Sequence, residues 1–156
     1  MTQIYQNPQL VDFLQVMSAL RADELAQYEA FSGDEFNAQR VAAFMVLQTG
    51  PRWVAVRGDT PVAVAGFDLI RPGVWQDWMF STDGAWEPGA WRSVTKHVCK
   101  GMTAMLQSGA HRLQCVSLAT RVQAHAWYRV LGLRQEGVLR RYGVNGEDAI
   151  MFARTE

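Results

Sequence analysis

The chain has 156 residues, of which 49% are hydrophobic and 19% charged, and its formal net charge is zero. This composition is that of a globular protein and excludes a largely disordered one, and the balanced charge argues against nucleic acid or a membrane surface as a partner. The length favours a single domain, 1–156, that buries roughly two-thirds of its unfolded surface.

Cysteine content and the hydrophobic segments predict where the protein works. Cys99 and Cys115 are too few for a disulfide framework and belong to no metal-spaced cluster, so we expect two reduced, buried thiols and no metal. No stretch approaches the roughly twenty apolar residues of a membrane span. The first ten residues, MTQIYQNPQL, lack the basic and apolar regions of a secretory signal. These features predict a cytoplasmic protein.

The first third of the chain is expected to be a short strand, Gln3–Gln6, followed by helices. Pro8 suits the first turn of a helix over 8–20, whose apolar positions are Leu10, Phe13, Leu14 and Met17. A second helical region runs over 23–48 with an interruption near Ser32-Gly33. Asp34 is expected to cap its later half, whose apolar positions are Phe36, Ala43, Phe44 and Leu47.

The middle of the chain changes to the pattern of strands. Gly58-Asp59-Thr60 is a hairpin turn between predicted strands over 53–57 and 61–69, and a third strand covers 74–81. After a loop over 82–89, a helix over 90–107 has a buried face formed by Trp91, Val94, Val98, Met102 and Met105. A further strand is expected over 111–118.

The last third is predicted to be a helix, then two strands. Residues four positions apart recur in three rows, which is typical of a helix lying on an apolar surface. The rows are Val122, Ala126 and Val130; Ala124, Tyr128 and Gly132; and Trp127 and Leu131. Gly132 suits a left-handed C-cap, and Leu133 can make the hydrophobic contact that accompanies it. Asn145-Gly146 predicts a type I′ hairpin between strands over 138–144 and 148–153.

The segment 124–137 resembles the last helix and strand of the GNAT superfamily, the GCN5-related N-acetyltransferases. Its matching positions are Ala124, Trp127, Tyr128, Gly132, Leu133, Glu136 and Gly137. The predicted order, β-αα-βββ-α-β-α-ββ, is also the GNAT order. The resemblance therefore implies an α+β fold with a mixed, mostly antiparallel twisted sheet flanked by helices, and it implies acetyl-CoA or coenzyme A as a ligand.

GNAT enzymes hold the coenzyme A diphosphate with a Gln/Arg-x-x-Gly-x-Gly/Ala motif that opens the central helix, where free amides and the helix dipole favour an anion. The corresponding residues here are Trp86-Glu87-Pro88-Gly89-Ala90-Trp91, so two tryptophans replace the first and last motif residues and Pro88 removes one donor. The basic stripe Arg92, Lys96 and Lys100 either meets phosphates or is a solvated helix face. The residues expected to contact the cofactor are Phe80, Ser81, Trp86, Gly89, Ala90, Trp91 and Arg92.

In this family the tyrosine at the place of Tyr128 is the candidate general acid for the departing thiolate, and its ordinary pKa of about 10 keeps it protonated at neutral pH. On sequence alone Tyr128 is equally a buried aromatic of the helix. No general base stands out. Asp77, Glu136, His97, His125 and a water molecule are all open as the base; we expect both histidines on helix surfaces and Glu136 at the strand start.

A shorter resemblance lies in Phe80-Ser-Thr-Asp83-Gly-Ala-Trp86, which is similar to GNAT-like proteins of T7-like bacteriophages. This resemblance implies a phage protein, working in host cytoplasm, that binds a host or virion protein and has little or no catalysis. The neighbouring indoles of Trp75, Trp78, Trp86 and Trp91 suit either a binding surface or the core. The sequence thus predicts an acyl-CoA-binding protein that is an N-acetyltransferase, a partner-binding relative, or both, with a host enzyme as its target.

Overall fold

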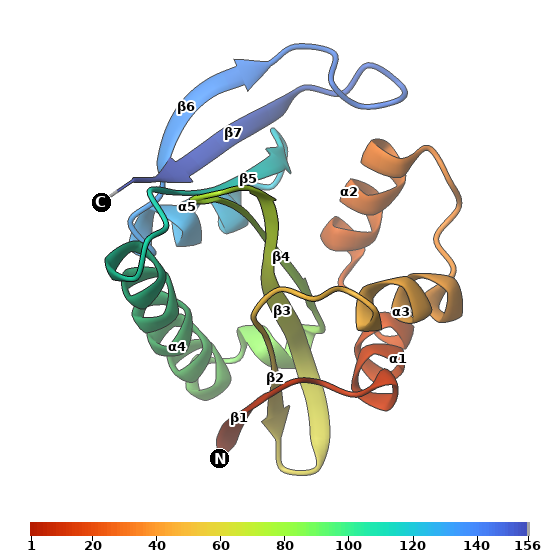
Figure 1. Ribbon diagram of the computed structural model, residues 1–156. Helices are drawn as coiled ribbons and strands as arrows, with labels where there is room; N and C mark the ends of the chain where they lie inside the picture. Colours follow the sequence, from red (N-terminus) through yellow and green to blue (C-terminus); the bar gives the residue numbers. More distant parts are fainter. Residues whose placement is uncertain (156) are drawn as a thin grey trace.

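The computed structural model describes residues 1–155, which form one seven-stranded sheet with helices on both faces (Figure 1). The strands are β1 (Thr2–Gln6), β2 (Arg52–Arg57), β3 (Thr60–Arg71), β4 (Val74–Ser81), β5 (Arg112–Leu118), β6 (Arg134–Leu139) and β7 (Ala149–Arg154). The helices are α1 (Leu10–Ser18), α2 (Ala22–Ser32), α3 (Ala38–Val46), α4 (Pro88–Gln107) and α5 (Val122–Val130), with a 3-10 turn, η1, at Asp83–Trp86.

The sheet has the strand order β1-β2-β3-β4-β5-β7-β6, and every neighbouring pair except one is antiparallel. The exception is β4 with β5, which run parallel and pair only over Val74–Gln76 and Arg112–Gln114. Beyond that point the two strands diverge. The predicted α+β class with a mixed, mostly antiparallel sheet is confirmed, and the divergence opens the middle of the sheet.

Alternating side chains of the central strands feed two separate cores, one on each face. Trp53, Ala55, Ala65 and Phe67 pack with Val94, Val98 and Met102 of α4 and with Trp127 and Leu131 of α5. Val54, Val64, Trp78 and Phe80 pack on the opposite face with α1 and α3. Figure 1 shows the resulting layers, with α4 on one side of the sheet and α1 to α3 on the other.

The end of α5 forms as the sequence predicts. Gly132 has φ +87° and follows the last residues of the helix. Its N–H donates to Arg129 O, and the Leu133 N–H donates to Tyr128 O, which is the hydrogen-bond pattern of a Schellman motif. Leu133 is buried, so a hydrophobic contact completes the cap.

Three predictions about the helical region are wrong and one is confirmed. The interruption predicted near Ser32-Gly33 forms, since α2 ends at Ser32 with Gly33 as its C-cap and α3 begins at Ala38, so three helices precede β2. Asn37, not Asp34, caps α3 by accepting from the Arg40 N–H at 2.9 Å. The buried face of α3 is Val41, Ala42 and Met45, while Phe44 and Leu47 are exposed, because α1 packs against the former set. The first helix begins at Leu10, two residues later than Pro8.

The connection between β6 and β7 also differs from the prediction. Asn145-Gly146 does not close a two-residue hairpin, because β6 ends at Leu139 and the loop runs over 140–148. The Val144 N–H donates to Ala30 O of α2, and the Tyr142 ring packs edge-on against Phe31. Contacts with α2 therefore hold this loop. Two-residue hairpin turns form instead at Gly58-Asp59, between β2 and β3, and at Pro72-Gly73, between β3 and β4.

Candidate active site

A cavity of about 80 Å³ lies where β4 and β5 diverge. Asp77 and Cys115, the first residues beyond the paired segment, both line it, and their side chains contact each other where the strands no longer pair. Arg121 and Tyr128 of the α5 region and Glu24 of α2 line it as well. The interruption of the sheet thus creates a chamber that contains acidic, basic and phenolic groups.

Tyr128 lines this chamber and is partly buried. Burial raises the pKa of its hydroxyl above the ordinary value, while Arg121 and the Ser117 hydroxyl act in the opposite direction. The phenol is therefore protonated across the whole working range of a protein and can donate a proton. Behind it, Ser117 is fully buried and its Oγ lies 3.2 Å from His125 Nε2. His125 is itself buried, so the prediction of a surface histidine is wrong.

Asp77 is the candidate base that the structure brings to the chamber. Burial raises the pKa of its carboxyl to about 7, near the value that suits a general base at neutral pH. The other candidate residues do not line the chamber. Glu136 pairs with Arg112 at 2.6 Å, the His97 ring packs on Trp53, and the His125 ring contacts Ser117. Geometry therefore singles out Asp77 among the residues that the sequence left open.

Three indoles form a wall at one side of the chamber. We call Trp86, Trp91 and Trp127 the indole wall. The Trp86 and Trp91 rings stack with centroids 3.9 Å apart, and Trp91 lies 4.6 Å from Trp127. Trp86 is held further by donating from Nε1 to Ser81 Oγ at 3.0 Å. Trp86 and Trp127 line both the chamber and an outer groove, so the wall separates the two spaces.

The outer groove runs between α4 and α5 and has a volume of about 600 Å³. Its α4 side presents Arg92, Thr95 and Lys96, and its α5 side presents Gln123, Ala126 and Val130. The row Val122, Ala126 and Val130 is exposed, although its spacing suggested an apolar contact, and its last two members line the groove. Neither Arg92 nor Lys96 has an ion pair with any residue in 1–155. The groove thus combines free cations with an apolar wall.

The N-terminus of α4 begins with Pro88, and its N-cap residue Glu87 accepts no capping bond. The Glu87 carboxylate instead pairs with Arg57, which removes some of the repulsion that a phosphate would meet there. Gly89 stands in open space, since a Cβ placed on it would meet no described atom within 4 Å. First-turn amides lack partners within a helix, so Gly89 and Ala90 offer two donors.

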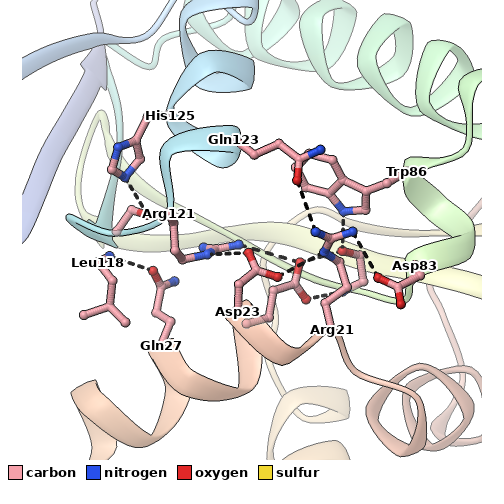
Figure 2. A network of polar contacts seen from close by, with 12 residues as sticks. Arg21, Asp23, Gln27, Asp83, Trp86, Leu118, Arg121, Gln123 and His125 are labelled. Carbon is pink, nitrogen blue, oxygen red and sulfur yellow. Dashed lines mark hydrogen bonds and ion pairs between the residues drawn. The ribbon is translucent and has the colours of Figure 1, made fainter.

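A polar network closes the chamber on the side of α2 (Figure 2). Glu24 is buried and accepts from both the N–H and the Oγ–H of Ser81, and burial raises the pKa of its carboxyl to about 7. One turn later Gln27 accepts from the Leu118 N–H at 2.9 Å. Two side chains of α2 therefore satisfy the amides at the ends of β4 and β5, which no longer pair with each other.

Two arginines extend the same network. Arg121 donates from Nε to Asp23 at 2.9 Å, and Arg21 donates to Asp23, Asp83 and Gln123. The Arg21 guanidinium also lies 4.4 Å from the centroid of the Trp86 ring, so the network touches the indole wall. The sequence analysis missed Glu24, Gln27 and both arginines, because no local motif marks residues that meet only through the tertiary fold.

The expected cofactor contacts do not all gather at one place. Trp86, Trp91 and Arg92 lie at the groove and Gly89 and Ala90 at the start of α4, but the Phe80 ring packs in the core shared with α1 and α3. Ser81 is fully buried, with its N–H and hydroxyl bound to Glu24. Cys115 is buried and Cys99 is only half-buried, and both thiols are free.

Solved acetyltransferase structures share this fold over the whole chain. A ribosomal-protein-alanine N-acetyltransferase from Brucella melitensis aligns with a TM-score of 0.77 at 15% identity, covering 99% of each chain. The ribosomal-protein-S18-alanine N-acetyltransferase from Escherichia coli aligns with a TM-score of 0.70 at 17% identity, covering 98% of this chain and 92% of that one. A Bacillus subtilis acetyltransferase in complex with CoA aligns with a TM-score of 0.65 at 12% identity, covering 100% of this chain and 99% of that one.

These likenesses establish the fold, which is that of GNAT acetyltransferases such as one from Streptococcus pneumoniae. No protein-family model matches the sequence, and no curated protein matches it either. Within residues 1–155 no helix is long and apolar enough to cross a membrane. The same residues contain no cluster of three or more His, Cys, Asp or Glu that could hold a metal ion.

Proposed function

We propose that the protein binds acyl-CoA, with acetyl-CoA as the simplest case, and transfers the acyl group to an amine. The observation that carries this proposal is that a candidate acid, the Tyr128 phenol, and a candidate base, the Asp77 carboxyl, line the same chamber. Their pKa values are pushed apart, with Asp77 at about 7 and Tyr128 above its ordinary value. Such a pair can hold a base and an acid at the same pH.

The chain's residues divide the chemistry between them. The thioester supplies an acyl carbon that an amine nitrogen attacks, with loss of the C–S bond. Asp77 would accept the proton that the amine loses, and Tyr128 would give its proton to the departing sulfur. The positive charge of Arg121 beside Tyr128 stabilises the phenolate that is left, which Asp77 can reprotonate directly or through water at the end of the cycle.

Acyl-CoA fits the surroundings of the chamber in part. The amides of Gly89 and Ala90 and the cations Arg92 and Lys96 would hold its phosphates at the start of α4 and along the groove. The indole wall stands between this groove and the chamber. Trp91 packs from the groove against Trp86 and Trp127, which line both spaces, so movement of Trp91 would free these two rings to open a path between groove and chamber.

The test is release of free coenzyme A thiol from acetyl-CoA in the presence of a panel of amines, including amino acids and a peptide with N-terminal alanine. We expect turnover with at least one amine and a loss of about 100-fold or more in kcat for Tyr128→Phe. The matched control is Tyr142→Phe, which removes a hydroxyl from an exposed ring outside the chamber. No turnover with any amine, or equal turnover in Tyr128→Phe, would contradict the proposal.

The indole wall also favours a second function. The stacked Trp86 and Trp91 rings stand between the groove and the chamber. A closed path of this kind suits a GNAT-like phage protein that has no catalytic activity and binds a host or virion protein. The resemblance of Phe80–Trp86 to phage proteins stays a prediction. Affinity capture of a host protein that is lost in Trp86→Ala, together with no binding of acetyl-CoA, would favour this second function.

A further inference from the structure

The guanidinium of Arg121 is buried but only partly paired. The residue is 8% exposed and lines the chamber. Its Nε donates to Asp23 at 2.9 Å, whereas Nη2 lies 3.8 Å from Glu24 Oε1, too far for a hydrogen bond. With every residue of 1–155 considered, its terminal nitrogens donate no hydrogen bond. No fully buried side-chain nitrogen within 1–155 lacks a hydrogen bond, so these terminal nitrogens are open to the chamber, where they can donate to an anion.

The position of Arg121 at the start of α5 also favours an anion beside it. It is the N-cap residue of α5, and its side chain gives no cap to the helix. Ala124, in the first turn of α5, also lines the chamber. First-turn amides lack intrahelical partners and the helix dipole is positive at this end, so the helix and the guanidinium favour an anion at the same corner.

The chamber is acidic on another wall. Asp77 projects from β4 at the point where the sheet opens, and the Cys115 thiol is the side chain beside it. A carboxyl group there suits an amino group. The chamber is therefore polarised, with an anion-favouring corner at Arg121 and a cation-favouring wall at Asp77.

We propose that the acceptor is a small free amino acid, whose carboxylate binds the Arg121 guanidinium and whose amino group faces Asp77. This inference rests on the proposed acyl transfer and names its acceptor. A volume of about 80 Å³ holds roughly three water molecules at about 30 Å³ each, which suits a ligand as small as glycine or alanine. Such a chamber selects an amino acid over a simple amine. The bound ammonium group gives one proton to solvent to become the nucleophilic amine, and Asp77 accepts the second proton as the amide bond forms.

The test compares glycine with glycinamide, which keeps the amino group and lacks the carboxylate. Binding of each to the full-length protein is followed by NMR titration with the isotope-labelled probe, without acyl-CoA. We expect glycine to bind roughly tenfold to a hundredfold more tightly, as a charge-assisted hydrogen bond implies. Equal affinities, or no binding of either probe, would overturn the inference.

Variants locate the effect. Arg121→Gln should abolish the preference for glycine, and Arg121→Lys, which keeps the charge, should retain part of it. Arg21→Gln is the matched control, since Arg21 also binds Asp23 but does not line the chamber, and it should keep the full preference. A full preference in Arg121→Gln would contradict the inference.

The two proposals fail separately. Acyl transfer to glycinamide and glycine at equal efficiency would leave the proposed function standing and refute the acceptor. Selective glycine binding without any turnover of acetyl-CoA would leave the acceptor site standing and refute acyl transfer.

Discussion

The chamber between β4 and β5 is closed on two sides by different physical means. Toward the groove the indole wall closes it with stacked rings, and toward α2 the network of Glu24, Asp23 and Arg121 closes it with ion pairs and hydrogen bonds. Ring stacking is insensitive to pH and nearly insensitive to salt, whereas a buried carboxyl is sensitive to pH. The two sides should therefore respond to different perturbations.

The largest effect on activity is expected inside the chamber, which the indole wall and the α2 network both close. Asp77→Asn removes the proposed base and should lower kcat/KM by about 100-fold. In the wild type the pKa of Asp77 is raised to about 7 by burial, so kcat/KM should rise as pH increases through about 7 and then level off. The variant should lose this rise. A pH–rate profile from pH 5.5 to 9 measures both, and an unchanged profile in Asp77→Asn would exclude it as the base.

Glu24→Gln perturbs the polar closure through pH. Burial raises the folded-state pKa of Glu24 from 4.5 to about 7, so the folded protein binds more protons than the unfolded chain between these values. The stabilisation is fully present below pH 4.5 and is lost as pH rises through about 7.

Between pH 5 and 8 the free energy of unfolding of the wild type should fall by about 2 to 3 kcal/mol more than that of Glu24→Gln. Urea unfolding at the two pH values provides the measurement. Asp77→Asn is a useful comparison, because the raised pKa of Asp77 in the wild type also makes the free energy of unfolding fall as pH rises. Parallel pH dependence in the wild type and Glu24→Gln would show that Glu24 titrates as an ordinary carboxyl.

Trp91→Ala perturbs the apolar closure. Loss of a half-buried indole should lower the free energy of unfolding by about 2 kcal/mol, less than the cost at a fully buried site. At the same time the opened wall should lower the KM for acetyl-CoA by about tenfold, since binding no longer has to move the ring. Trp91→Phe, which keeps an aromatic ring in the stack, is the matched control. A higher KM in Trp91→Ala would mean that the indole contacts the ligand and does not obstruct it.

The smallest effect is expected where the two closures meet, at Arg21. Its partner Asp83 is largely exposed, and exposed ion pairs contribute little. Arg21→Gln should therefore change the free energy of unfolding by about 1 kcal/mol or less, with only a weak dependence on salt. Thermal unfolding at low and high ionic strength measures this, and a loss above 2 kcal/mol would make Arg21 the centre of the network.

The sequence predicted the fold well because local signals agreed with it. The Gly132 cap, the buried face of α4 and the Gly58-Asp59 turn all form from residues close together in the chain. The failures have a common cause in contacts with distant elements. Phe44 is exposed because α1 selects another face of α3, and the Asn145-Gly146 segment is held by α2 and does not form a tight hairpin.

The candidate site was predictable only in its parts. Tyr128 could be named from the family resemblance of its helix and Asp77 from its place on a strand, but their shared chamber depends on where β4 and β5 stop pairing. The departures at Trp86 and Trp91 were visible in the sequence, yet their stacking with Trp127 was not. Glu24 and Arg121 are separated by 97 residues in the chain and meet only in the folded protein.

Titration calorimetry of the wild-type protein with acetyl-CoA tests the central claim most directly, that the groove and the chamber form one acyl-CoA site behind a movable indole wall. The account predicts saturable binding of one molecule per chain, tighter in Trp91→Ala than in the wild type. No saturable heat at millimolar acetyl-CoA in either protein would contradict it.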